Sequence, residues 1–377
     1  MPGYMASKTL GGTGRSLLNL LATVDTGRYA VDLAIIGSGA LFIDLLPATV
    51  RRVAFGPLVT TAINLTYELR IAEIAGKLLG RYAEIIRWRM LKPWLGRENR
   101  VYDVAIAYAT EYLCQAYVLE GVAANRKLSV VHIDFAREAH NGKLIRAYED
   151  IFARVDAVAA VSDTARISLT ELFPRSAGKV TTVRNIVSSA AIARLAGEEI
   201  PPLAAGGQTG IVTVAGFGAE KGVDLALAAL RILIAAGYAV KWYFIGDGET
   251  RQDCERYAAA AGLGGSAVFL GTRDNPYPYV RAADLYVQPS RSESYCLAVD
   301  EALILRRPVV ATDIPAFRAR LTDGENALLA APSAEGLAAA VKRLIDSPGL
   351  RATLVKGAAL LDLDTKGEIG KLYALFD

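Results

Sequence analysis

Two glutamates, Glu293 and Glu301, stand eight positions apart in the stretch whose residue types are best suited to binding chemistry. Glu293 lies in a loop after an apolar run typical of a buried strand, and Glu301 falls in the second turn of the helix predicted next. Carboxylates accept hydrogen bonds from hydroxyl groups, and the amides of a helix N-terminus, here 294–297, bind phosphate. A carboxylate on a helix is more often a solvated surface charge. Two of them flanking an apolar turn favour a site for a nucleotide-linked sugar.

Two glycine-bearing turns ahead of predicted helices could also hold an anion. The turn 215–222 reads AGFGAEKG and places Lys221 at the start of a helix, and glycines that include Gly12 precede a periodic helix over 16–24. Helix starts offer N–H groups and a positive partial charge. An exposed loop lysine and a plain tight turn explain these segments equally well when each is taken alone.

His132 is one of two histidines in the chain and follows a predicted buried strand. A core histidine with its hydrogen bonds satisfied is an equally good explanation of a single histidine at such a place. Its position at the end of a strand, where ligands of open sheets bind, favours contact with a ligand.

Short strand-like segments alternate with longer helical segments along the whole chain. Most strand segments are rich in Val, Ile and Ala without polar alternation, as in strands buried on both faces. The predicted strands are 30–36, 50–55, 103–108, 128–134, 156–161, 179–184, 210–215, 240–245, 267–271, 284–288 and 308–311. This rhythm predicts an α/β protein with two Rossmann-like, doubly wound parallel-sheet domains that face a central cleft, the default place for a ligand.

A stretch near 198–210 that gathers Pro and Gly predicts the border between the two domains. The N-terminal domain would cover 1–197 and the C-terminal domain 198–365. The first strand expected of a Rossmann-like domain is missing, because residues 1–8 are poor strand formers. A truncated start explains this better than a weakened N-terminal domain.

Length and composition narrow the class of protein. A chain of 377 residues favours two domains, and a net charge of +3 gives no reason to expect nucleic acid as a partner. The sequence has no apolar run long enough to span a membrane, and its opening does not resemble a signal peptide. The three cysteines are far apart and odd in number, which indicates reduced thiols. We therefore expect a cytoplasmic protein.

A long helix predicted over 61–100 ends in a segment, 87–100, with five basic residues and two tryptophans. Basic residues beside tryptophans suit the headgroups of an anionic membrane, which would place the protein peripherally on the inner face of the cytoplasmic membrane. A solvated helix whose apolar stripe packs on the N-terminal sheet explains the pattern equally well.

The segment from Glu293 to Glu301 resembles the E-x7-E motif of the retaining family-four (group one) glycosyltransferases, which have the GT-B fold. The stretches TVAGFGAEKGVDLALAAL, KWYFIGDGE and PVVATDIPAFRARLTDGENALLA follow in family order, so the resemblance covers nearly the whole donor-binding C-terminal domain. It is looser in LGGTGRSLLNLL, YDVAIAY, VVHIDF and VAAVSDTAR. The chain is similar to bacterial enzymes that build capsular, exopolysaccharide or teichoic-type polymers. The resemblance also implies that a last helix, 366–377, packs back on the N-terminal domain.

The resemblance implies a role for each matching residue. Glu293 would contact hydroxyls of the transferred sugar, Glu301 would hold the ribose, and Lys221 would neutralise the β-phosphate of the leaving group. His132 would sit beside the sugar and the acceptor, and Gly12 would let the N-terminal loop approach the diphosphate. The implied catalytic set is His132, Lys221 and Glu293, and the implied donor-binding set is Gly12, Gly216, Lys221, Glu293, Ser294, Tyr295, Cys296, Leu297 and Glu301.

The chain departs from the family at Gly216, where an arginine is common. Arg273 and Arg291 also follow predicted strands and could supply the missing charge. Alternatively, the glycines at 216, 218 and 222 could bring backbone N–H groups close to the phosphates.

We therefore expect an enzyme, a retaining glycosyltransferase that moves a hexosyl or N-acetylhexosaminyl group from a UDP-sugar to a glycan or lipid-linked acceptor of the cell envelope or an exopolysaccharide. No cofactor and no metal is expected, because Lys221 and the amides of 294–297 would stabilise the charge of the leaving group. Two other functions stay open. One is a non-catalytic sugar-nucleotide-binding partner of another glycosyltransferase, and the other is a sugar-nucleotide epimerase on the same fold.

Overall fold

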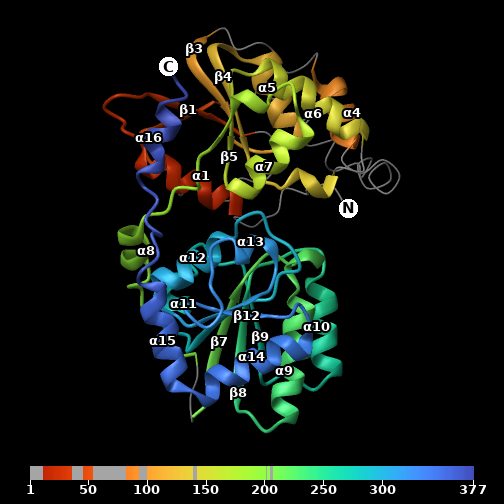
Figure 1. The fold of residues 1–377 in the computed structure, drawn as a ribbon, viewed down its shortest axis with the longest axis vertical. Coiled ribbons are helices and arrows are strands. Elements are labelled where there is room, and N and C mark those ends of the chain that lie inside the picture. Colours follow the sequence, from red (N-terminus) through yellow and green to blue (C-terminus); the bar gives the residue numbers. More distant parts are fainter. Residues whose placement is uncertain are drawn as a thin grey trace. The chain divides into compact units, whose positions relative to one another are not determined.

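The computed structural model describes residues 12–35, 46–53, 82–92, 100–138, 142–200, 202–203 and 207–377 (Figure 1). The chain divides into two compact units, which we call unit 1 (Met1–Ile186 with Thr365–Asp377) and unit 2 (Val187–Asp364). The predicted gap in strand structure at 1–8 lies outside the described residues, and so does most of the predicted helix 61–100. None of the described helices is long and apolar enough to cross a membrane.

Unit 2 contains a parallel sheet of six strands. In chain order they are β7 (Thr209–Val214), β8 (Val240–Ile245), β9 (Ala267–Gly271), β10 (Leu285–Gln288), β11 (Val309–Thr312) and β12 (Leu328–Ala330). Their order across the sheet is β12-β11-β10-β7-β8-β9. The chain therefore begins in the middle of the sheet and reverses direction between β7 and β10. In doubly wound sheets this point of reversal is where ligands bind, outside the carboxyl ends of the strands.

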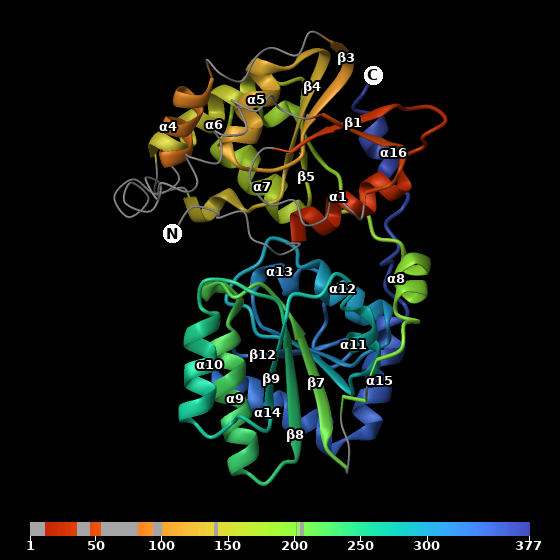
Figure 2. The ribbon, with the colours of Figure 1, turned by 180° about the vertical axis from the view of Figure 1, so that it is seen from behind.

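Helices cover both faces of this sheet, as Figure 2 shows. One face carries α9 (Val223–Ala235), α10 (Arg251–Ala260) and α14 (Ala334–Asp346), and the other carries α8 (Ser189–Leu195), α11 (Tyr277–Ala282) and α12 (Leu297–Ile304). Successive strand residues point to opposite faces of the sheet. Ile211 therefore lies in the apolar core with α9, α10 and α14, and Val212 lies in the core with α8, α11 and α12. Burial on both sides explains why these strands read as unbroken apolar runs. The remaining elements of unit 2 are η4 (Ala219–Lys221), α13 (Pro315–Arg318) and α15 (Pro348–Ala358).

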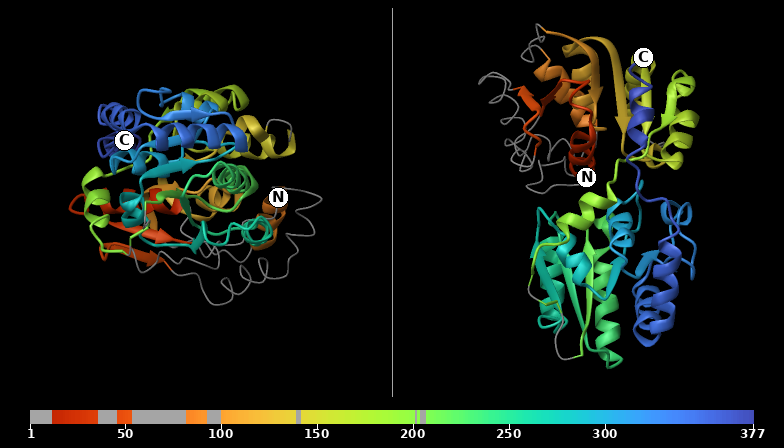
Figure 3. Two further views of the ribbon diagram at one scale, coloured as in Figure 1. Left: turned by 90° about the horizontal axis from the view of Figure 1, so that it is seen from below. Right: turned by 90° about the vertical axis from the view of Figure 1, so that its left-hand side faces the viewer.

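Unit 1 contains a parallel sheet in the order β3 (Val101–Ala107), β4 (Ala123–Val131), β5 (Ala157–Ala160) and β6 (Val180–Thr182), and a separate parallel pair, β1 (Val31–Ala34) and β2 (Val50–Val53). Helices α5 (Tyr112–Gly121), α6 (Gly142–Arg154) and α7 (Asp163–Leu172) pack on one face of the larger sheet, and α4 (Tyr82–Leu91) packs on α5 and α6. The other face is covered by α1 (Gly12–Thr23) and by α16 (Glu368–Tyr373), the blue helix beside the orange strands in the right-hand view of Figure 3. Two short 3-10 helices, η2 (Phe135–Glu138) and η3 (Ala177–Lys179), are the other elements among the described residues of unit 1.

The α/β class predicted from the sequence is confirmed, and each of the eleven predicted strands overlaps an observed one. Strand β12 was not predicted, because three apolar residues carry too little periodicity to separate a strand from a loop. Helix α1 begins at Gly12 rather than at residue 16, so Gly12 and Gly14 lie within its first turn.

The border between the units lies eleven residues before the predicted one, at 186/187 rather than at 197/198. The reason is packing: Val187, Ile192, Ala196 and Leu203 are buried in the apolar core of unit 2. The Pro- and Gly-rich stretch that suggested a linker therefore falls within the bounds of unit 2.

Candidate functional site

The candidate site lies where the loops after β7 and β10 meet, at the point of reversal in the sheet of unit 2. Gly222 has φ +67°, and a Cβ there would stand 2.0 Å from the carbonyl oxygen of Pro289. The amides of Arg291 and Ser292 both donate to the carbonyl of Glu220, at 2.7 and 3.4 Å. The two loops thus contact each other through their backbones, and glycine at 222 is what permits this contact.

Gly216, in the first of these loops, is exposed and is not held by close contacts. A Cβ at this position would stand 3.8 Å from the carbonyl oxygen of Asp247, an ordinary contact, whereas a Cβ at Gly246 would stand 1.9 Å from the carbonyl oxygen of Ala215. The tight packing around 215–217 therefore comes from the glycines of the neighbouring loop after β8. The structure gives no steric reason for glycine at 216.

Lys221 and Glu293 form an ion pair across the two loops, with Nζ 2.8 Å from Oε2. The Glu293 side chain is 7% exposed and the Lys221 side chain 27%. Burial alone would lower the pKa of Lys221, but the adjacent Glu293 carboxylate outweighs it and raises that pKa above its usual value. Lys221 is therefore a stable cation at neutral pH.

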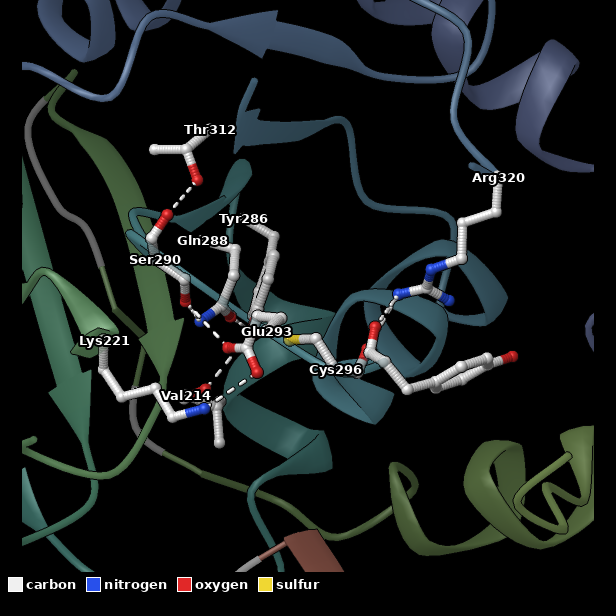
Figure 4. A network of polar contacts seen from close by, with 10 residues as sticks. Val214, Lys221, Tyr286, Gln288, Ser290, Glu293, Cys296, Thr312 and Arg320 are labelled. Atoms are coloured by element: carbon white, nitrogen blue, oxygen red, sulfur yellow. Dashed lines mark hydrogen bonds and ion pairs between the residues drawn. The ribbon is translucent and has the colours of Figure 1, made fainter. Parts of the chain in front are cut away.

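A buried row of polar side chains stands behind Glu293, as Figure 4 shows. The Ser290 hydroxyl donates to Oε1 of Glu293 at 2.8 Å, and Nε2 of Gln288 donates to the Ser290 hydroxyl at 2.9 Å. The Tyr286 hydroxyl in turn donates to Oε1 of Gln288 at 2.6 Å. Each of the three side chains behind Glu293 is at most 1% exposed.

Glu301 occupies the second turn of α12, and its side chain is buried, with 6% of the residue exposed. Its Oε1 accepts a hydrogen bond of 2.9 Å from the hydroxyl of Tyr277, which belongs to α11 in the loop after β9. A buried carboxylate needs polar partners, and a ligand hydroxyl is one group that could supply them. Glu301 is therefore not a solvated surface charge, although most carboxylates on helices are.

The turn that starts α12 has an unusual backbone at Cys296, whose φ of 70° and ψ of 80° are left-handed. Arg320 donates through Nη2 to the carbonyls of Tyr295 and Cys296, at 2.7 and 3.0 Å, and its guanidinium lies 4.3 Å from the centre of the Tyr295 ring. Across a trans peptide the carbonyl and the following N–H point in opposite directions. The amides of Cys296 and Leu297 therefore point away from Arg320, and within the described residues neither donates to a protein acceptor.

The Cys296 thiol lies in the same turn and stays protonated. Burial, followed by the neighbouring Glu293, raises its pKa well above the usual value. This thiol is thus a small polarisable group in the site and not a nucleophile.

His132 and Gly12 belong to unit 1. His132 follows β4, its amide donates to the Thr110 hydroxyl at 2.8 Å, and its ring packs on Tyr108 with centroids 4.9 Å apart. Burial lowers the pKa of His132 to about 4, so the imidazole is neutral at pH 7. Its Nε2 is buried and has no partner within the described part of the chain. Gly12 is the exposed first residue of α1, and a Cβ there would meet nothing within 4 Å.

Of the residues named from the sequence, the structure brings Lys221 and Glu293 into contact and places Ser294, Tyr295, Cys296 and Leu297 in the same turn. Of the two arginines named as replacements for the family arginine at 216, one is held in an ion pair and the other is exposed. Arg291 binds both carboxylate oxygens of Asp224, at 2.7 and 2.6 Å, and Arg273 is exposed and donates to the neighbouring carbonyl of Thr272. Half of the basic segment 87–100, residues 93–99, lies outside the described residues.

Sequence reasoning missed the partners that hold these residues. Ser290 and Gln288 are polar residues at the end of an apolar strand, a signal that the sequence does contain. Tyr277 and Arg320 come from other loops, and nothing in the sequence around Glu301 or Cys296 points to them.

Residues 208–347 match the protein-family model described as "Glycosyl transferases group 1". The matched segment is similar to the domains of that family. It lies within unit 2 and carries Lys221, Glu293 and Glu301.

Two curated relatives match a similar part of the chain. Alpha-D-kanosaminyltransferase of Streptomyces kanamyceticus is 30% identical over 154 residues, which are 40% of this chain and 40% of that protein. The lipopolysaccharide core biosynthesis glycosyltransferase LpsE of Rhizobium meliloti is 30% identical over 115 residues, 30% of this chain and 34% of that protein. The chain thus aligns with well under half the length of these relatives.

A solved structure resembles the chain over nearly its whole length. The Anabaena protein Alr3699/HepE, solved in complex with UDP-glucose, gives a TM-score of 0.70 at 17% sequence identity over 97% of this chain and 96% of that chain. At this identity the likeness concerns the fold, and it confirms the predicted α/β architecture of the GT-B type.

Proposed function

We propose that this protein is a glycosyltransferase that uses a nucleotide-diphosphate sugar as donor. The observation that carries the proposal is the pairing of Lys221 with Glu293 at the point of reversal of a doubly wound sheet. A cation and a carboxylate side by side suit a donor with an anionic diphosphate and a sugar rich in hydroxyls. The group 1 domain match and the UDP-glucose bound to the Anabaena protein support this choice.

In the proposed reaction the bond between the sugar and the diphosphate breaks, and negative charge grows on the departing oxygen. Lys221 would neutralise that charge, together with the outward-pointing amides of Cys296 and Leu297. Glu293 would accept hydrogen bonds from the sugar and Glu301 from the ribose. His132, as a neutral imidazole, would accept or donate a hydrogen bond beside the acceptor and would carry no charge.

The proposal also covers the stereochemistry of the reaction, the donor sugar, the metal requirement and the acceptor. We infer retention of the anomeric configuration, a UDP-linked hexose or N-acetylhexosamine, and no need for a divalent metal. The acceptor would be a lipid-linked or growing glycan of the cell envelope, in keeping with the lipopolysaccharide core relative. The protein would then work at the inner face of the cytoplasmic membrane, with the basic segment 87–100 on anionic lipid. Salt-sensitive binding to anionic vesicles, and none to neutral vesicles, is the expected result.

The test is a thermal-shift screen against nucleoside diphosphates and nucleotide sugars, followed by transfer assays with and without a metal chelator. We expect UDP and UDP-sugars to raise the melting temperature, the chelator to leave turnover unchanged, and the product to keep the anomeric configuration of the donor by NMR. Glu301→Ala should weaken UDP binding by about 1.5–3 kcal/mol, because a charged hydrogen bond to the ribose is lost. Binding without transfer or donor hydrolysis would instead favour a non-catalytic partner, and interconversion of two UDP-sugars would favour an epimerase.

A further inference from the structure

The carboxylate of Glu293 is held on each oxygen by a different kind of group. Lys221, a long and flexible side chain with 27% of its surface exposed, binds Oε2 at 2.8 Å. Ser290, which is fully buried, binds Oε1 at the same distance. One partner can move when a ligand arrives, and the other is fixed by packing.

In the row behind Glu293, each hydrogen bond is donated toward Glu293 by the residue farther from it. The Ser290 hydroxyl already accepts a hydrogen from Nε2 of Gln288, so its own hydrogen goes to Glu293. Gln288 presents its amide nitrogen to Ser290 because its amide oxygen accepts from the Tyr286 hydroxyl. The main chain of Ser290 is held as well, since the Thr312 hydroxyl donates to its carbonyl. Tyr286 and Gln288 therefore orient Ser290 as a donor toward Glu293.

We propose that Ser290 is a positioning residue that keeps Glu293 in place when an anion draws Lys221 away from it. This inference rests on the proposed use of a nucleotide-diphosphate sugar. A diphosphate competes with Glu293 for the ammonium group, and once it wins, the Ser290 hydroxyl still holds Glu293 on Oε1. With Ser290 present the carboxylate stays turned for the sugar hydroxyls. Without Ser290 it can follow Lys221 or turn to solvent, and the sugar loses its acceptor.

The inference predicts that losing the serine hydroxyl damages recognition of the sugar and spares recognition of the diphosphate. In Ser290→Ala, measured by calorimetry without acceptor, we expect the Kd for UDP to change less than about twofold. The Kd for the UDP-sugar that the wild type transfers fastest should rise, and kcat should fall, by about 10- to 100-fold each, the range for a lost hydrogen bond to a charged group. The matched control is Ser168→Ala, which removes a buried hydroxyl that donates only to the carbonyl of Ala165 within α7 of unit 1. It should leave all three quantities unchanged.

Two further measurements separate positioning from a general loss of structure. If Ser290 acts through Glu293, adding Ser290→Ala to a Glu293→Ala variant should cost no more than about twofold in sugar binding. Tyr286→Phe, which removes only the far end of the row, should give a smaller loss in the same direction. Equal losses for UDP and the UDP-sugar in Ser290→Ala, or fully additive effects in the double variant, would overturn the inference.

The wild-type titrations distinguish failure of the inference from failure of the proposed function. A wild type that binds UDP-sugars, beside a Ser290→Ala variant with unchanged sugar recognition, removes the positioning role and leaves the function standing. A wild type that binds no nucleotide sugar at all removes both.

Discussion

At the scale of single residues, Lys221 is the group whose surroundings must change most during the proposed reaction. In this structure the charge of Lys221 is balanced by Glu293 at 2.8 Å, so a bound diphosphate must replace a contact that already exists. Lys221 therefore adds little to the free energy of donor binding. It adds much more to the stability of the transition state, in which charge grows on the leaving group. Interactions that strengthen only in the transition state raise kcat.

Lys221→Met should accordingly lower kcat far more than it weakens UDP binding. We expect a loss of about 100-fold or more in kcat, as for other single groups that stabilise a departing anion, and a change in the Kd for UDP of less than about tenfold. Lys356→Met, which alters an exposed lysine of α15, is the control. Steady-state kinetics measure kcat, and calorimetry measures the Kd for UDP. Full turnover in Lys221→Met would remove this residue from the mechanism.

His132 should give stability a dependence on pH that belongs to unit 1. Its pKa is about 4 in the folded protein, against an ordinary value of 6.5, so below pH 6.5 the unfolded chain binds a proton that the folded chain does not. The contribution is fully present above pH 6.5 and is lost as the pH falls toward 4. The wild type should therefore lose more thermal stability than His132→Gln between pH 7.5 and pH 5. Equal losses in the two proteins would show that the imidazole is not buried in the neutral form.

At the scale of elements, the site depends on how closely the loops after β7, β8 and β10 approach one another. Glycines in left-handed or crowded positions allow this, and Gly222 does so between the two loops that carry Lys221 and Glu293. The loops after β7 and β10 come from strands that are neighbours in the sheet but far apart in sequence. Their contact is therefore a property of the fold and not of either loop.

Gly222→Ala should destabilise unit 2 and reduce activity together. A Cβ at φ +67° costs about 1–3 kcal/mol in backbone strain, and this one would also stand 2.0 Å from the Pro289 carbonyl oxygen. Gly264→Ala is the matched control, because a Cβ there meets nothing within 4 Å. Chemical denaturation and UDP binding measure the two effects. A Gly222→Ala variant as stable as Gly264→Ala would show that the loops do not need this contact.

The sequence predicted those parts of the fold that depend on local pattern. The buried strands have apolar runs because helices cover both of their faces, and the positions of Glu293 in a loop and Glu301 in the second turn of a helix follow from spacing along the chain. The row behind Glu293 could not be predicted, since it depends on side-chain rotamers and on which strand lies beside β10. The observed border between the units differs from the predicted border for a similar reason. The burial of Ile192 and Leu203 is set by tertiary packing, whereas Pro and Gly mark only local irregularity.

At the scale of the whole molecule, unit 2 is inserted into unit 1, because the chain leaves unit 1 at 186/187 and returns to it at 364/365. The returning segment is tied to its own unit: the Thr365 hydroxyl donates to the carbonyl of Asn185 at 2.7 Å, and Arg184 pairs with the buried Glu368 at 3.0 Å. Helix α16 also places Leu372 in the core with Leu20. These contacts make α16 a structural part of unit 1.

Leu372→Ala should therefore destabilise unit 1 and leave unit 2 unaffected. Removing a buried leucine side chain costs about 2–5 kcal/mol, and Leu372 is 4% exposed. Leu360→Ala is the control, since that leucine is 88% exposed. Hydrogen exchange should show faster exchange in β4 and β5 of the Leu372→Ala protein and none of this change in β7–β12. Faster exchange in both units would mean that they unfold as one body.

The return of the chain at 365 also fixes the order in which the molecule can be completed during synthesis. All strands of unit 1 leave the ribosome before unit 2 begins, yet one face of the sheet formed by β3–β6 waits for α16, which is made after the last helix of unit 2. Unit 2 is a continuous segment, so it can fold as soon as it has emerged. Until then the apolar core that contains Val130, Ala159 and Val161 has its cover from α1 and lacks Leu372, and a chaperone that recognises apolar residues would bind the nascent chain there.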